Sequence, residues 1–239
     1  IFSRAAGAIC GMIGELEESD EDKAIIVASM FGNTTRCVNE AMAILEKAGY
    51  EVLVFHATGT GGRAMESLIE SGMVSGVLDL TTTEWADEVV GGILSAGPER
   101  LDAMSAANIP AVIAPGCVDM ANFGAKETVP EAFQDRTLYI HNPQVTLLRT
   151  NASECAQIGK ILADKANANK APVAILNPLK AVSEINGEGQ PFHDAEADNA
   201  LFNAIRDHAR VEVIDLDLEI NDPAFAAACA NKLLELMNE

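Results

Sequence analysis

Polar, glycine-rich segments that could hold a small molecule follow the apolar runs of this sequence. The first segment is Gly32-Asn33-Thr34-Thr35, two residues after the run 24–29. N–H groups at a helix start attract anions and hydroxyl groups add donors, so this segment could cradle a phosphate. A turn with a threonine cap explains the same residues equally well.

The second segment, residues 56–62, includes the start of a G-x-G-x-x-A pattern that runs from Gly59 to Ala64. Gly59, Gly61 and Ala64 occupy its fixed positions, and Asp79 lies twenty residues beyond Gly59 at the end of the next apolar run. This spacing is typical of a dinucleotide-binding loop. Such loops normally belong to the first strand–helix unit, and here the loop is in the second. The alternative is a glycine-rich loop that lets the backbone approach another small ligand.

Hydroxyl, thiol, carboxyl and imidazole groups follow the next runs. Thr81-Thr82-Thr83-Glu84 places three hydroxyl groups and a carboxylate at a strand end, where a capped helix start would explain one threonine but not three. Cys117, Asp119 and His141 could act as nucleophile, orienting acid and base. The alternative for Cys117 is a small buried hydrophobic residue. Arg149 is one of the few cations near these loops and is our preferred anion partner.

The candidate residues therefore form two sets. The binding set is Gly32, Asn33, Thr34, Thr35, His56, Thr58, Gly59, Gly61, Gly62, Thr81, Thr82, Thr83 and Arg149, and the catalytic set is Glu84, Cys117, Asp119 and His141. We assign no metal ligands. The histidines lack metal-ligand spacing, and the acidic residues after His193 read better as a helix start than as a cation site. Five scattered cysteines make a disulfide framework or a structural zinc site a poor explanation.

Seven short apolar runs predict the strands that would position these residues. They are mostly continuous rather than alternating, as in parallel strands covered on both faces. The runs are 24–29, 50–55, 76–80, 111–114, 137–140, 172–176 and 211–214. Helical periodicity between them predicts a Rossmann-like, doubly wound α/β fold with helices on both faces. Ligands of such sheets bind outside the carboxyl ends of the strands, so the polar loops predict a cleft there.

Helix boundaries are also readable. Residues 34–48 and 64–71 carry apolar residues on one face and end at Gly49 and Gly72. Asn151 with Glu154 reads as a capping pair, and Asp222 followed by proline reads as a helix start.

Charge and composition limit the partners. The 239 residues include 16 Lys and Arg against 36 Asp and Glu, a formal net charge of −20. This argues against binding the nucleic-acid backbone or an anionic membrane. No run approaches the roughly 18 apolar residues of a membrane span. We expect a cytoplasmic protein.

The first residues are apolar and small, without an initiator methionine or a basic leader. We interpret residues 1–22 as an interdomain helix and acidic linker that follow an absent N-terminal domain, and residues 23–239 as the domain itself. Without its neighbour the helix would expose Ile9, Met12 and Ile13, so we expect a homo-oligomer.

Ordered blocks along the whole chain resemble one family, the two-domain proteins related to the tomato mosaic virus resistance protein, described as Tm-1-like ATP-binding domain proteins. The blocks are residues 5–12, 30–35, 55–66, 79–84, 115–123, 141–143 and 220–225. The resemblance implies that this chain is the second of two Rossmann-like domains. The ATP-binding description belongs to the first domain, so ATP binding by this chain is not implied. The plant relative acts by binding a viral replication protein.

Three functions remain open from the sequence. The first is a small-molecule site, catalytic or not, for a phosphorylated or carboxylated metabolite or a nucleotide. The second is an NAD(P)-dependent oxidoreductase that uses Gly59, Gly61 and Asp79. The third is an interaction module whose acidic surface meets a basic protein. The residues leave the cofactor unknown, and they do not decide between an enzyme and a binder.

Overall fold

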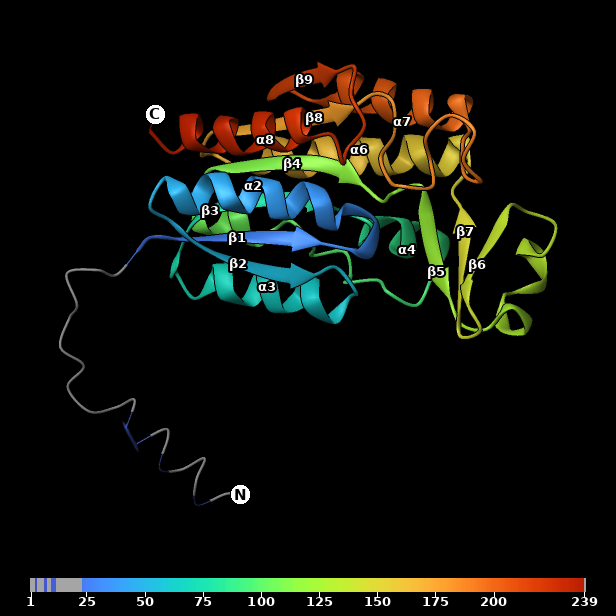
Figure 1. The fold of residues 1–239 in the computed structure, drawn as a ribbon, viewed down its shortest axis with the longest axis horizontal. Helices are drawn as coiled ribbons and strands as arrows, with labels where there is room; N and C mark the ends of the chain where they lie inside the picture. The colour runs from blue at the N-terminus through green and yellow to red at the C-terminus, as the bar shows by residue number, and fades with distance from the viewer. Residues whose placement is uncertain (1–2, 4–6, 8–9, 12–22, 239) are drawn as a thin grey trace.

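The computed structural model describes residues 3, 7, 10–11 and 23–238 (Figure 1). The helix and linker expected over residues 1–22 fall almost wholly outside these ranges. Within the described residues no helix is long and apolar enough to cross a membrane.

A six-stranded parallel sheet forms the centre of the domain. Its order is β2-β1-β3-β4-β8-β9. The strands are β1 (Ile25–Met30), β2 (Glu51–His56), β3 (Val74–Thr81), β4 (Ala111–Gly116), β8 (Val173–Pro178) and β9 (Glu212–Leu216). The predicted α/β class is confirmed. The continuous apolar runs arise because β3, β4 and β8 are buried on both faces.

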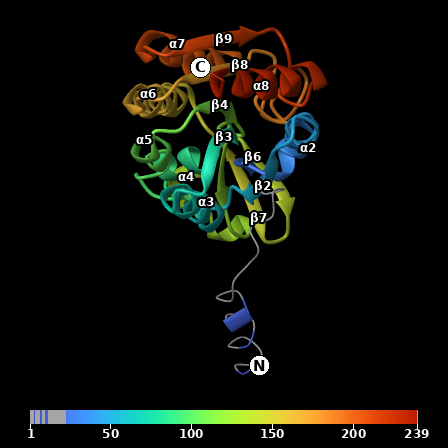
Figure 2. The same cartoon turned by 90° about the vertical axis from the view of Figure 1, so that its left-hand side faces the viewer.

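Helices cover the two faces of this sheet (Figure 2). They are α2 (Thr35–Lys47), α3 (Thr60–Glu70), α4 (Glu84–Val90), α5 (Ala103–Ala107), α6 (Ala152–Ala168), α7 (Ala195–His208) and α8 (Pro223–Leu236). Apolar side chains of α2 and α8 pack on one face, around Ile26, Leu78 and Val112. Those of α3 to α7 pack on the other face, around Val27 and Ile113.

The predicted helix ends agree with the structure, whereas α3 begins at Thr60, four residues before the start predicted at residue 64. Gly49 and Gly72 follow α2 and α3 with φ of +100° and +78°, a left-handed region that favours glycine. Asn151 and Glu154 form a reciprocal capping box at the start of α6. The Asp222 carboxylate accepts the Ala224 N–H at the start of α8.

The predicted seven-stranded sheet is corrected to six strands. The run 137–140 belongs to β6 (Leu138–Asn142) of a separate antiparallel sheet, β5-β7-β6, with β5 (Met120–Phe123) and β7 (Val145–Arg149). Only the short 3₁₀ turns η2 (Lys126–Thr128) and η3 (Glu131–Phe133) separate β5 from β6. A parallel crossover needs a dozen or more residues, usually a helix, whereas two residues between β6 and β7 make a hairpin. This small sheet stands beyond the carboxyl ends of the main strands (Figure 1).

Candidate functional site

A cavity of about 420 Å³ lies at the carboxyl ends of β1 and β2, against the β6–β7 hairpin. We call it the cleft. Its lining is Phe31, Gly32, Asn33, His56, His141, Val145, Leu147 and Glu184. The predicted cleft at this edge of the sheet is therefore present, and four of the predicted site residues line it: Gly32, Asn33, His56 and His141.

The first wall of the cleft comes from the 3₁₀ turn η1 (Gly32–Thr34) and from the end of β2. The rings of Phe31 and His56 are stacked, with centroids 5.3 Å apart and planes at 26°. The Asn33 amide donates to the Met120 Sδ over 3.4 Å, and the Asn33 carbonyl accepts from Asn221 over 2.8 Å. These contacts fix the turn against strand β5 of the small sheet and against the loop before α8.

The second wall is the small sheet. Val145 and Leu147 are two residues apart on β7 and so point to the same face. Leu147 belongs to an apolar cluster with Cys117, Met120 and Phe192, and Val145 packs against this cluster. Glu184, in the loop between β8 and α7, was not among the candidate residues. Sequence reasoning also missed Val145 and Leu147, because it predicted no strand over β7. Its alternation of Val145 and Leu147 with Thr146 was the available signal.

The crevice between β1 and β3, where the strand order reverses, is filled by the protein's own polar groups. The hydroxyl groups of Thr34 and Thr81 hydrogen-bond over 2.8 Å, and the Ser29 hydroxyl donates to Asp79 over 2.6 Å. Ser29 Oγ also accepts the Thr81 N–H over 2.9 Å. The cleft therefore lies beside the switch point, over β1 and β2.

The other predicted hydroxyl groups have partners inside the protein. Thr82 and Thr83 are buried and donate to backbone carbonyl groups of β4 and β5. Thr35 and Thr58 donate to the carbonyl groups of Gly32 and His56. These threonines join strand ends and turns, so the structure does not place them in the cleft.

The glycine-rich loop has the wrong geometry for a dinucleotide. The N–H groups of Gly59 and Gly62 both donate to Glu84 Oε1, over 2.6 Å and 3.1 Å. A Cβ on Gly61 would lie 1.8 Å from the His56 carbonyl oxygen. The loop therefore packs on a buried carboxylate where a pyrophosphate would have to sit. Glu84, a candidate catalytic residue, holds this loop in place.

Arg100 is the centre of a buried ionic cluster that sequence reasoning missed. Its side chain is 1% exposed and contacts Asp79 at 2.6 Å, Glu84 at 2.7 Å and Glu66 at 2.9 Å. Burial raises the pKa of Glu66 although Arg100 lowers it. Asp79 is thus a partner of this guanidinium, which contradicts a role in binding ribose. Arg100 follows Gly97-Pro98-Glu99, which looks like an exposed loop, so no local signal marked it.

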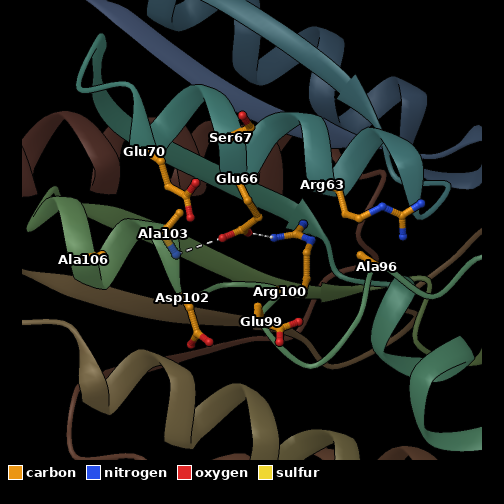
Figure 3. A pocket seen from close by; sticks show the side chains of 10 residues that line it. All are labelled: Arg63, Glu66, Ser67, Glu70, Ala96, Glu99, Arg100, Asp102, Ala103 and Ala106. Carbon is orange, nitrogen blue, oxygen red and sulfur yellow. Dashed lines mark hydrogen bonds and ion pairs between the residues drawn. The ribbon is translucent and has the colours of Figure 1, made fainter.

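A second cavity, of about 320 Å³, lies between α3 and α5 beside this cluster (Figure 3). Glu66 points toward Arg100 and accepts the N–H groups of Leu101 and Ala103 over 2.8 Å and 2.9 Å. Its oxygens are therefore committed to holding the loop before α5. Glu66 in this cavity thus joins α3 to the segment that carries Arg100.

The proposed Cys117, Asp119 and His141 arrangement is not assembled. Cys117 is fully buried, and burial, followed by nearby Asp119, raises the pKa of its thiol well above the usual range. His141 is exposed on β6, and among the described residues no hydrogen bond joins it to the other two. Asp119 accepts the Ser183 hydroxyl over 2.8 Å. Cys117 is the small buried hydrophobic residue of the alternative interpretation.

Arg149 is not exposed to the cleft, which corrects its assignment as the anion partner. Its side chain is 5% exposed, donates to the Phe192 carbonyl over 2.7 Å and pairs with Asp198 at 2.5 Å. The side chain is enclosed because β7 packs against the long loop that precedes α7. Asp194 caps α7 by accepting the Ala197 N–H, as the acidic helix start predicted.

Asp119 should give the protein a measurable pH dependence. Burial raises its pKa to about 6, and one of its oxygens has no hydrogen-bond partner among the described residues. Because its folded pKa lies above the unfolded value, ionisation destabilises the fold as pH rises from about 4 to 6. We expect Asp119→Asn to remove about 2 kcal/mol of the difference in unfolding free energy between pH 4.5 and 7.5. Urea unfolding at both pH values measures this difference. If the unfolding free energy changed equally with pH in the unmodified protein and in Asp119→Asn, Asp119 would not be the source of the pH dependence.

Comparison with known proteins gives the relatives of this chain. Residues 23–237 match the family described as "Uncharacterised protein family (UPF0261) C-terminal domain". A UPF0261 protein of Clostridium tetani is 52% identical over 243 residues, which cover 100% of this chain and 60% of the relative. The ToMV resistance protein Tm-1(GCR237) of Solanum lycopersicum is 43% identical over 246 residues, which cover 99% of this chain and 33% of that protein.

A solved structure, the oxidised flavodoxin 2 of Bacillus cereus, aligns with 90% of this chain and 98% of its own at 11% identity and a TM-score of 0.30. That likeness carries no conclusion about a ligand. The chain spans about three-fifths of the bacterial relative's length and one-third of the tomato protein's. With a match over nearly its whole length and a relative that is 52% identical, the chain belongs to the UPF0261 family and corresponds to its C-terminal domain.

Proposed function

We propose that this domain binds a small anionic metabolite, carboxylated or phosphorylated, in the cleft between the ends of β1 and β2 and the β6–β7 hairpin. The observation that supports the proposal is the cavity of about 420 Å³ at the carboxyl edge of a parallel sheet. Ligand pockets are typically concave and mainly apolar, with a few polar groups that orient the ligand. The cleft combines three apolar side chains with two histidines, one asparagine and one glutamate.

The position of the histidines supports an anion as the ligand. His56 ends β2 and His141 lies on β6, so two imidazole rings reach the cleft from separate sheets. A protonated imidazole donates from both nitrogens, and charge-assisted hydrogen bonds to a carboxylate or phosphate are stronger than neutral ones. A rigid scaffold holds both walls, because Phe31 stacks on His56 and Asn33 contacts Met120.

Filling the cleft should abolish this binding. Val145 is half-buried on the cleft wall, and Val145→Trp should occupy the cavity with an indole and lower metabolite affinity at least tenfold, because the ligand and the indole compete for the same volume. Calorimetry or ligand-observed NMR with a library of carboxylates, sugar phosphates and nucleotides measures it.

The control is Ile140→Trp, on the same small sheet. Ile140 is 54% exposed and does not line the cleft. The support for this function would be removed if no compound of the library bound the unmodified protein. It would also be removed if Val145→Trp and Ile140→Trp bound every compound with the same affinity.

A further inference from the structure

The lining of the cleft carries no fixed positive charge. Among its described residues there is no lysine or arginine, and its ionisable groups are His56, His141 and Glu184. Two buried arginines outside this lining are committed elsewhere: Arg100 to three carboxylates, and Arg149 to Asp198 and backbone carbonyl groups.

This charge pattern discriminates between the two kinds of anion. A phosphate monoester carries about −1.5 to −2 charges near neutral pH and is usually held by arginine forks or lysine. In the cleft it would face the Glu184 carboxylate, in a protein of net charge −20, without an arginine or lysine to neutralise it. A carboxylate carries one charge, which one imidazolium can balance.

The apolar wall limits the body of the ligand. Phe31, Val145 and Leu147 present carbon surface, and the His56 ring is stacked on Phe31. Sugar hydroxyl groups placed against this wall would lose water without gaining partners, which is costly. A flat ring or a branched hydrocarbon chain would instead bury apolar area, and a ring can extend the existing stack.

From these observations, and resting on the proposed function, we infer that the cleft selects a monocarboxylate with an apolar, preferably aromatic, body over phosphorylated compounds. The carboxylate lies toward the imidazoles of His56 and His141, and the body lies against Phe31, Val145 and Leu147. Glu184 disfavours a second negative charge on the ligand.

Three probes with one ring and different head groups test this inference. Benzoate, benzamide and phenyl phosphate differ in charge while the phenyl body is constant, and acetate keeps the charge without the body. Methyl resonances of Val145 and Leu147 report binding in the cleft during NMR titrations. We expect benzoate to bind at least tenfold more tightly than each of the other three.

Two histidine variants test whether His141 binds the carboxylate of the ligand. His141→Gln should weaken benzoate binding about tenfold, because a charge-assisted hydrogen bond is lost, and should leave benzamide nearly unchanged. The control His193→Gln changes another exposed histidine that does not line the cleft and should leave both affinities unchanged.

The outcomes separate this inference from the proposed function. Phenyl phosphate that binds in the cleft as tightly as benzoate would overturn the inference and leave the proposed function intact. If benzamide bound as tightly as benzoate, the cleft would not select the negative charge of the ligand. If acetate bound as tightly as benzoate, the cleft would not select an apolar body. If neither these probes nor any carboxylate, sugar phosphate or nucleotide of the wider library moved the Val145 and Leu147 resonances, both proposals would fail.

Discussion

Replacing Arg100 with methionine should cost the protein about 3–5 kcal/mol of unfolding free energy at neutral pH, a large share of the about 5–15 kcal/mol of a typical domain. Methionine fills a similar volume but leaves the carboxylates of Asp79, Glu84 and Glu66 buried without their counter-ion. An uncompensated buried charge is far more costly than the loss of an exposed ion pair. Circular dichroism during urea unfolding measures the effect.

Two further measurements identify the cause as charge. Lower pH should reduce the deficit of Arg100→Met, because protonation of the carboxyl groups removes the uncompensated charge. Arg206→Gln is the matched control: its pair with Asp215 is more than one-third exposed, and we expect a loss below about 1 kcal/mol. If the loss of unfolding free energy in Arg100→Met were small, or did not change with pH, the charge of Arg100 would not be what stabilises the three carboxylates.

Gly61→Ala should destabilise the fold by about 3 kcal/mol or more, although it adds only a methyl group. The new Cβ would lie 1.8 Å from the backbone carbonyl oxygen of His56, and strand β2 would have to move to accommodate it. Overpacking typically costs 1–3 kcal/mol, and a clash with backbone belongs at the upper end of that range or beyond. Thermal and urea unfolding measure the loss.

The matched control is Gly32→Ala in the other candidate loop. A Cβ at Gly32 would meet no atom within 4 Å, and Gly32 is not among the glycines with positive φ, so its stability should change by less than about 0.5 kcal/mol. Equal stability of Gly61→Ala and Gly32→Ala would contradict the close approach of the glycine-rich loop to β2. Because Gly61 variants perturb folding, a loss of ligand binding in them would not identify Gly61 as a binding residue.

The sequence determined the class of fold and the edge of the sheet that carries the cleft. Continuous apolar runs separated by helical periodicity specify a parallel sheet, since only strands covered on both faces read that way. Gly32 follows β1 and His56 ends β2, and the carboxyl ends of these parallel neighbours lie at one edge of the sheet. These features are local in the chain, so they are visible without coordinates.

Only the tertiary structure decided which polar groups the protein uses internally. Glu84 accepts from Gly59 and Gly62, and Asp79 pairs with Arg100; these partners are 21 to 25 residues apart in the chain. Pairing across such separations depends on how the strands are ordered and how the loops cross, which periodicity does not report. A buried carboxylate with its partners and an exposed catalytic carboxylate look identical in a sequence.

The hairpin shows the same limit. The apolar run 137–140 looked like one more strand of the main sheet, but the two-residue connection from β6 to β7 forces an antiparallel pair outside it. That pair supplies Val145, Leu147 and His141 to one wall of the cleft, while the same strand β7 buries Arg149 away from it. The sequence by itself therefore placed polar loops at one edge of an α/β sheet. The packing of this second sheet decided the apolar, arginine-free lining, because a side chain's exposure depends on what distant segments cover it.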